Sequence, residues 1–426
     1  MRIIKEEQID AFIKILQQRA SVSVKENDIQ KTVSKIIIDV QKQGDRAVKR
    51  YTEKFDSLKL SRLAVNKKEI ESASKKVDKN FLKALKLSAK RIRTFHERQK
   101  EKSWQFSNDG ITLGQIIRPV ERVGVYVPGG KAAYPSTVLM NIIPAQVAGV
   151  KEIALCVPTP DGKMNPYVAA AIKLLGVKEV YRIGGAQAVA ALAYGTETIK
   201  KVEKIVGPGN IYVAVAKKMV FGEVGIDMVA GPSEILIIAD KAANPEFIAS
   251  DMLSQAEHDE MASSILVTDS EVIAEEAKSE IAKQLKALKR KDMAKKSLKK
   301  YGAIILTKNL TDAVETANRI APEHLEVMTA KPAGLLPKIK NAGAIFLGQW
   351  TPEPLGDYAA GPNHTLPTGG TARFSSPLGV YDFIKRTSLL NSSKSGFMKL
   401  AGIVETLADV EGLEAHGNTV RVRRKK

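Results

Sequence analysis

Two residues with metal-ligand chemistry stand three apart in the stretch LSQAEHDEMASS, at positions 253–264. On a helix, Gln255 and His258 would project from the same face, because side chains three or four apart are neighbours there. An amide oxygen and an imidazole nitrogen can both bind a borderline cation such as zinc. A hydrogen-bonded histidine at a helix end explains the same pair, so this stretch alone leaves both interpretations open.

The stretch IAPEHLEVM, at positions 320–328, places an acid directly beside a histidine. It follows a segment of helical periodicity and precedes an apolar run that is typical of a strand. At such a junction Glu323 and His324 could transfer protons, one as acceptor and the other as a shuttle. A solvent-exposed turn is equally compatible with the local pattern.

Two further stretches combine a histidine with a carboxylate in irregular, polar sequence. PLGDYAAGPNHTLPTGG contains Asp357 and His364, and VEGLEAHGNTV contains Glu411 and His416. Loops carry catalytic and binding residues more often than regular elements do. Four of the five histidines of the chain occur in these polar stretches, which together indicate a site. We expect the fifth, His96 on a basic helix, to be an ordinary surface residue.

The pattern of apolar residues indicates which elements position these stretches. Residues 1 to about 102 have helical periodicity, and beyond them short Val- and Ile-rich runs alternate with helical segments. Such alternation predicts parallel strands with helices on their faces. One series covers 122–231 and another 233–348, which predicts two Rossmann-like sheets. The irregular segment 349–379 is long for a connection, and we therefore expect it to be functional.

Three glycine-rich turns occur at strand-to-helix junctions of the first series. They are VPGG (127–130), IGGAQAVAAL (183–192) and VGPGN (206–210). Glycines at such junctions let backbone amides approach an anion at a helix N-terminus. Tight α/β turns use the same residues for structural reasons, but three turns in one series favour a nucleotide site.

The net charge of +19 raises the possibility of a polyanion-binding protein. The excess cations lie in three windows, 83–102, 283–300 and 421–426, and the rest of the chain is neutral overall. Apolar residues recur at helical spacing in the two internal windows, so exposed faces of amphipathic helices explain the charge better. We expect no nucleic-acid partner.

A single cysteine, Cys156, lies in the apolar run KEIALCVPTP and predicts core packing without a disulfide. No segment approaches the ~20 apolar residues that a membrane span requires. These features predict a cytoplasmic protein without a membrane partner.

Seven stretches, in order along nearly the whole chain, resemble the histidinol dehydrogenase family: GVYVPGGKAAYPSTVLMN, GPGNIYVAVAK, DMVAGPSEILI, SQAEHD, APEHLE, GDYAAGPNHTLPTGGTARF and EGLEAH. The resemblance implies an α/β fold of two Rossmann-like, aldehyde dehydrogenase-like domains with small helical terminal segments. We expect an N-terminal helical segment at 1–21, a metal- and substrate-binding domain at 22–125 and 235–378, an NAD-binding domain at 126–234, and a C-terminal segment at 379–426. Tyr381 departs from the family, which often has an acid there.

The activity that the resemblance implies is the last step of histidine biosynthesis. It is the zinc-dependent oxidation of L-histidinol to L-histidine through L-histidinal, with two hydride transfers to NAD. One zinc ion per subunit would be bound by Gln255, His258, Asp357 and His416. Substrate contacts would come from these four residues and from Ser233, His324, His364 and Glu411. NAD contacts would come from Tyr126, Gln187 and Asn210.

The residues present are compatible with this chemistry. A histidine, with its ordinary pKa of about 6.5, can accept the hydroxyl proton at neutral pH, and His324 fits that role. Oxidation of an aldehyde requires hydration, and Glu323 could deprotonate the water. A cysteine thioester is the alternative route, but Cys156 is predicted to be buried. Water is therefore the expected nucleophile.

The resemblance also implies a homodimer in which the C-terminal segment is swapped, so that Glu411 and His416 serve the neighbouring subunit. One rival function is another zinc- and NAD-dependent oxidoreductase acting on a different amino alcohol. The other is the polyanion-binding protein, which salt-sensitive binding to nucleic acid would support.

Overall fold

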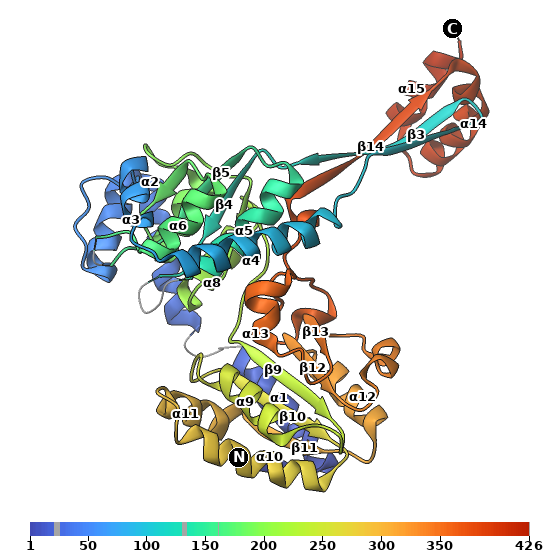
Figure 1. Ribbon diagram of the computed structural model, residues 1–426. Coiled ribbons are helices and arrows are strands. Elements are labelled where there is room, and N and C mark those ends of the chain that lie inside the picture. Colours follow the sequence, from blue (N-terminus) through green and yellow to red (C-terminus); the bar gives the residue numbers. More distant parts are fainter. Residues whose placement is uncertain (21–25, 130–133, 161, 426) are drawn as a thin grey trace.

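The computed structural model describes residues 1–20, 26–129, 134–160 and 162–425. It contains two α/β lobes and an elongated arm that ends at the C-terminus (Figure 1). Each lobe is built on one parallel sheet, and we name the lobes by their five-stranded and six-stranded sheets. No helix in the described part of the chain is long and apolar enough to cross a membrane.

The five-stranded lobe has the strand order β6-β5-β4-β7-β8, with every pair parallel. Its strands are β4 (Arg122–Tyr126), β5 (Glu152–Cys156), β6 (Glu179–Tyr181), β7 (Lys204–Val206) and β8 (Gly225–Ile226). The helices between them are α5 (Pro135–Ala148), α6 (Pro166–Leu175), α7 (Gly185–Tyr194) and α8 (Ile211–Val220). Apolar side chains cover both faces of the sheet, as its Val- and Ile-rich strands predict.

The six-stranded lobe has the order β1-β11-β10-β9-β12-β13, again with every pair parallel. Its strands are β1 (Arg2–Ile4), β9 (Glu234–Ala239), β10 (Ser263–Thr268), β11 (Ala303–Leu306), β12 (His324–Met328) and β13 (Ala344–Leu347). Its helices are α1 (Ile9–Ala20), α9 (Pro245–Ala256), α10 (Glu271–Leu285), α11 (Lys291–Tyr301) and α12 (Leu310–Ile320). The predicted α/β fold with two parallel sheets is confirmed.

The N-terminal quarter of the chain divides between the lobes, which corrects the predicted domain limits. β1 pairs with β11 and α1 packs on the six-stranded sheet, so 1–20 is part of that lobe. The helices that follow pack on the five-stranded sheet rather than on the six-stranded sheet, so 26–97 belongs with 126–234. These helices are α2 (Glu26–Asp56), α3 (Lys67–Ser74) and α4 (Lys79–Glu97). An amphipathic pattern shows which face of a helix is buried, but it does not identify the sheet that buries it.

The arm is built on a second kind of sheet, which the sequence did not predict. β2 (Trp104–Asn108), β3 (Ile111–Pro119) and β14 (Ile384–Ser392) pair antiparallel in the order β14-β3-β2. The helices α14 (Lys394–Val410) and α15 (Glu414–Arg424) pack at its far end (Figure 1). The residues of β14 are mostly exposed, so they lack the alternation that identifies a half-buried strand.

The two internal basic windows coincide with helices. α4 contains most of 83–102, and α10 and α11 contain most of 283–300. On α11 the buried residues include Ala294 and Leu298, and most of the lysines of the window are exposed. The prediction that these windows form amphipathic helices with exposed cations is confirmed.

Candidate active site

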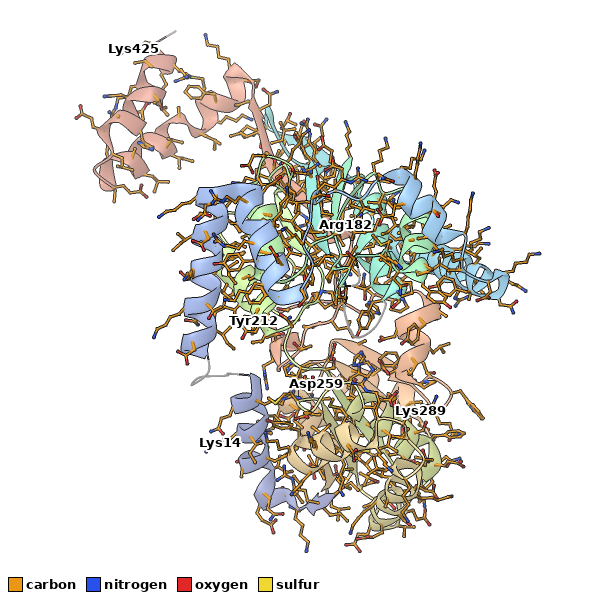
Figure 2. All side chains as sticks on the ribbon, turned by 90° about the vertical axis from the view of Figure 1, so that its left-hand side faces the viewer. Lys14, Arg182, Tyr212, Asp259, Lys289 and Lys425 are labelled. Carbon is orange, nitrogen blue, oxygen red and sulfur yellow. The ribbon has the colours of Figure 1, made fainter. Side chains whose placement is uncertain are left out.

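The predicted acid and histidine residues of the six-stranded lobe gather where the two lobes meet. β9 and β12 begin there, side by side, so the site lies at the amino ends of these parallel strands. The glycine-rich turns of the five-stranded lobe, at the carboxyl ends of its strands, face the same junction (Figure 1). Figure 2 shows Tyr212, at the start of α8, on one side of this junction and Asp259, just beyond α9, on the other side.

Glu323 and His324 are held at the start of β12 by the backbone of β9. Ala321 caps the C-terminus of α12 with a left-handed φ of 53°. Glu323 Oε2 then accepts a hydrogen bond from the N–H of Glu234 at 2.9 Å, and His324 Nδ1 lies 2.8 Å from the Glu234 carbonyl oxygen. Because that oxygen only accepts, Nδ1 carries a proton and Nε2 is left for chemistry. Glu323 and His324 are 6% and 4% exposed, so the exposed-turn interpretation is wrong.

Two further carboxylates approach His324 from the segment that follows β13. Nε2 lies 3.7 Å from Asp357 Oδ1 and 3.8 Å from Glu353 Oε1. The acids are four residues apart, on α13 (Glu353–Leu355) and the π-helical turn Gly356–Ala360 that continues it. Such π turns are frequent at functional sites. Among the described residues, these three side chains form a group close enough to hold a metal ion.

Glu353 is a site residue that the sequence analysis missed. It is 4% exposed, and burial raises its pKa to about 8, with the neighbouring Asp357 acting in the same direction. The sequence did contain a signal for Glu353: it lies four positions before Asp357, and this spacing places both carboxylates on one face of a helical turn. The prolines and glycines around this pair concealed the helical spacing.

The ionisation of the acid and histidine pair is set by burial and by mutual charge. Burial raises the pKa of Glu323 to about 7, which suits proton transfer near neutral pH. Burial acts to lower the pKa of His324, but the surrounding carboxylates, first that of Glu323, raise it to about 10. This is well above the ordinary value used in the sequence analysis. A cation that took up the carboxylate of Asp357 would remove one of the charges that raise it.

Gln255 and His258 lie at the end of α9. Gln255 is 1% exposed, and its Oε1 has no hydrogen-bond partner in the described part of the chain. An unsatisfied buried oxygen costs about 1–3 kcal/mol, which a bound cation would offset. His258 lies just beyond the end of the helix, and not on a helix face beside Gln255 as the spacing predicted, and it is exposed. Its partial burial lowers its pKa, while the charge of Asp357 acts in the opposite direction.

Ser233 and His364 lie around the same centre. Ser233 directly precedes β9 and is half-buried. His364 lies in the irregular segment, and its Nε2 is 3.4 Å from Oγ1 of Thr137, in the first turn of α5. This contact holds the irregular segment against the five-stranded lobe at the site. Burial lowers the pKa of His364, with the charge of Asp357 acting against it.

Glu411 and His416 are not brought to the site within one chain. Glu411 follows α14 and His416 lies on α15, and both are exposed. These helices lie at the end of the arm, beyond the five-stranded lobe, whereas β12 and α13 lie in the six-stranded lobe (Figure 1). A single subunit therefore contains six of the eight predicted metal and substrate residues at this junction.

The three predicted NAD residues lie at the carboxyl ends of the strands of the five-stranded sheet. Tyr126 ends β4, and its hydroxyl oxygen accepts a hydrogen bond from Gly185 N at 3.2 Å; burial raises its pKa to about 12. Gln187, in the first turn of α7, is buried, with Oε1 lacking a partner among the described residues. Asn210 caps α8 by accepting from the N–H groups of the next turn, which leaves its amide nitrogen for a ligand.

The turn at Gly207 requires a glycine. Its φ is 112°, and a Cβ there would collide with the backbone carbonyl of Tyr126. Asp227 stabilises this loop: it accepts a hydrogen bond from Gly207 N at 2.8 Å and forms an ion pair with the buried Lys217. Of the three predicted glycine-rich turns, VPGG reaches Gly130, which lies outside the described residues.

His96 is not a surface residue, which corrects the sequence analysis. It is fully buried, with Nδ1 2.8 Å from Ile92 O and Nε2 3.3 Å from Asn363 Nδ2. Asn363 also donates to Met140 O at 2.6 Å. His96 therefore anchors the irregular segment one residue before His364, through a contact between residues 267 positions apart.

Cys156 is fully buried at the end of β5, as predicted, and burial raises the pKa of its thiol. We expect Cys156→Ala to leave turnover near the wild-type value, because a buried, protonated thiol is a poor nucleophile. Steady-state kinetics with a thermal melt would check this, since the small cavity should lower stability by about 1 kcal/mol. Loss of turnover in a folded variant would restore the thioester route.

The two parallel sheets and the buried acid and histidine pair where the lobes meet define a two-lobed α/β protein with an enzyme-like site. The fold is shared with an acetylating aldehyde dehydrogenase from Geobacillus thermoglucosidasius, at 13% identity and a TM-score of 0.51 over 91% of this chain and 97% of that one. A solved histidinol dehydrogenase from Elizabethkingia anophelis is far more similar. It aligns with a TM-score of 0.94 and 38% identity over 100% of this chain and 98% of that chain.

The chain belongs to the histidinol dehydrogenase family, whose model matches residues 18–424. The histidinol dehydrogenase of Aquifex aeolicus is 56% identical over 94% of this chain and 93% of its own length. That of Bacillus subtilis is 51% identical over 96% and 97%, respectively. The predicted family resemblance is confirmed, and the protein is an oxidoreductase of this family.

Proposed function

We propose that this protein oxidises L-histidinol to L-histidine through L-histidinal, with two successive hydride transfers to NAD. The observation that carries the proposal is the buried pair of Glu323 and His324, directed into the junction between the lobes and beside Asp357. Membership of the histidinol dehydrogenase family supports the choice of substrate.

Three of the predicted ligands at the junction offer donor groups of the kinds that bind zinc, which supports a zinc site there. Gln255 offers a buried oxygen without a partner, His258 an imidazole of lowered pKa, and Asp357 a carboxylate. Zinc would supply a Lewis acid that orients the hydroxyl and imidazole of the substrate. His416 of a second subunit would complete the protein ligands. Glu353 and His324 lie close enough to Asp357 to contact the same substrate.

The glycine-rich turns of the five-stranded lobe fit a dinucleotide. Tyr126, Gln187 and Asn210 lie there at the carboxyl ends of parallel strands, where α/β sheets bind such ligands. The N-termini of α7 and α8 can stabilise phosphate charge. NAD bound there would accept each hydride.

The two oxidations divide between His324 and Glu323. In the first, Nε2 of His324 has to be unprotonated, which a cation that takes up the charge of Asp357 would favour by lowering the raised pKa of His324. Nε2 then accepts the hydroxyl proton of histidinol as a hydride leaves the carbon, and the product is the aldehyde. In the second, the Glu323 carboxylate removes a proton from water as the oxygen bonds to the aldehyde carbon, and the carbonyl oxygen takes the proton that His324 accepted in the first oxidation. The resulting hydrate loses a second hydride and a proton to give the acid. Each cycle thus consumes one water and yields two NADH and one histidine.

A swapped homodimer would bring Glu411 and His416 to the partner's junction. The arm supports this arrangement, because α14 exposes an apolar face that includes Ile403, Leu407 and Val410, at 57%, 58% and 82% exposure. Apolar faces of this kind usually mark an interface. A second copy of the chain would cover this face, and the arm of each subunit would then reach the other subunit.

Mixing two inactive variants tests this sharing. We expect Glu323→Gln and His416→Ala, coexpressed in equal amounts, to recover about a quarter of the wild-type activity, because half of the dimers are mixed and each has one complete site. As a control, Glu323→Gln mixed with His258→Asn should stay inactive, since both changes are in the same part of the site. Failure of the first mixture to recover activity, with mixed dimers present, would show that the sites are not shared.

Substrate comparison separates the proposal from a related oxidoreductase. L-histidinol should be turned over far faster than amino alcohols of similar size without an imidazole, because the ring would occupy a position in the metal site. Equal turnover of an imidazole-free amino alcohol would favour the alternative substrate class.

A further inference from the structure

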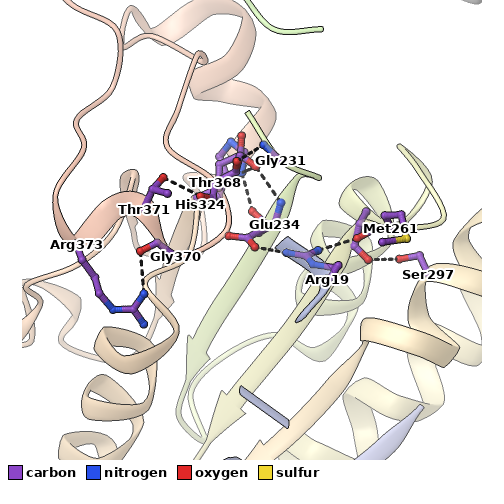
Figure 3. A network of polar contacts seen from close by, with 12 residues as sticks. Arg19, Gly231, Glu234, Met261, Ser297, His324, Thr368, Gly370, Thr371 and Arg373 are labelled. Carbon is purple, nitrogen blue, oxygen red and sulfur yellow. Dashed lines mark hydrogen bonds and ion pairs between the residues drawn. The ribbon is translucent and has the colours of Figure 1, made fainter. Parts of the chain in front are cut away.

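A buried ion pair lies directly behind Glu323 and His324. Arg19, near the end of α1, pairs through Nη2 with Glu234 Oε1 (Figure 3). The side chain of Arg19 is fully buried and that of Glu234 is 7% exposed. Neither residue was identified from the sequence, because Arg19 precedes the site by hundreds of positions and resembles any basic residue at a helix end.

Arg19 joins the beginnings of three neighbouring strands. Besides Glu234, the first residue of β9, it donates from Nη1 to Met261 O at 2.7 Å, two residues before β10. Its guanidinium carbon lies 5.5 Å from the ring centre of Tyr301, two residues before β11. A planar guanidinium can make these contacts at once, which a lysine ammonium cannot do with the same geometry.

Glu234 in turn holds both members of the acid and histidine pair through its backbone. Its N–H donates to Glu323 Oε2 at 2.9 Å. Its carbonyl oxygen lies 2.8 Å from His324 Nδ1 (Figure 3). The side chain of Glu234 binds Arg19, while its main chain sets the direction of Glu323 and the tautomer of His324. A shift of this one peptide would therefore move both groups.

We propose that Arg19 and Glu234 are positioning residues, which fix the peptide at the start of β9 and thereby orient Glu323 and His324 for the two oxidations. The inference rests on the proposed function for its kinetic consequence. Neither side chain is assigned contact with the substrate or with NAD. A buried ion pair adds little net stability compared with apolar packing, so a role in geometry explains its place behind the site.

Replacing Arg19 by methionine tests the role, since it removes the charge and the hydrogen bonds and leaves an apolar chain of similar length. We expect Arg19→Met to lower kcat by roughly 10- to 100-fold, because a small displacement of catalytic groups has effects of this size. The KM for NAD should change little. With L-histidinal supplied directly, kcat should fall as well, since Glu323 loses its orientation. The kcat of Arg19→Lys, which keeps the charge, should lie between those of the wild type and of Arg19→Met.

A second readout does not depend on turnover. Hydrogen exchange at the Glu234 amide, measured in the metal-free protein, should be faster in Arg19→Met, because the hydrogen bond to Glu323 is weakened. Asp10→Asn is the matched control, since Asp10 is on the exposed side of α1 and pairs with Arg319 there. This variant should leave both kcat and the exchange unchanged.

The outcomes separate the two claims. A folded Arg19→Met protein with wild-type kcat and wild-type exchange would overturn the positioning role. If Arg19→Met does not fold, Arg19→Lys with unchanged kcat and exchange would do the same. If the wild type does not oxidise histidinol but exchange at Glu234 still responds to Arg19, the proposed function fails and the positioning role stands.

Discussion

Replacing Glu323 by glutamine is expected to lower formation of the acid product by about 10²- to 10⁴-fold, the usual contribution of a general base. Glutamine has a similar shape and keeps an oxygen for the N–H of Glu234, but it cannot accept a proton from water. Zinc content and NAD binding should remain near the wild-type values. The measurement is histidine formed from L-histidinal and NAD, by chromatography, in a metal-loaded protein.

Glu315→Gln is the matched control for this change. Glu315 lies on α12, which leads into Glu323, and it is exposed. The control should show wild-type kinetics. Ordinary production of histidine by Glu323→Gln would contradict its role in activating water and would direct attention to Glu353, the other buried acid with a raised pKa.

Replacing His258 by asparagine is expected to lower metal content and activity together. The change removes a nitrogen donor at the end of α9 and leaves Gln255 without its neighbour. Loss of an outer-sphere partner alone typically costs 10- to 100-fold in metal affinity or activity, so loss of a ligand should cost at least that much. Metal analysis after dialysis and turnover at several zinc concentrations would measure both quantities.

Glu260→Gln controls for local disturbance near His258. Glu260 is two residues away, exposed, and paired with Lys296 on the surface, and such pairs contribute little. The Glu260→Gln variant should therefore retain the wild-type metal content and activity. A His258→Asn protein that is fully metallated and active would remove His258 from the ligand set and leave the group of His324, Glu353 and Asp357 as the candidate metal site.

Much of the fold could be predicted because strand and helix patterns are local. The Val- and Ile-rich runs from Arg122 to Leu347 form the parallel strands that their patterns indicate. The first strand, β1, was missed because three residues are too short to show a period. The helices of 26–97 were placed with the wrong sheet, since periodicity does not identify a helix's partner.

The site could be predicted only where chemistry coincides with an unusual local pattern. Glu323 and His324 met that condition at a helix-to-strand junction. His96 did not, because the contact that defines it comes from Asn363, far along the chain. Arg19 was missed for the same reason, since its partner Glu234 is 215 positions away. Such tertiary partners leave no local trace in a single sequence.

The balance of products tests the account most directly. Purified, zinc-loaded protein should convert L-histidinol, with excess NAD, into histidine with two NADH formed per histidine, and chelation should abolish the activity until zinc is restored. That result would support both oxidations and the metal together. A metallated dimer that forms no NADH with histidinol, or that forms one NADH and stops at the aldehyde, would contradict the proposed reaction.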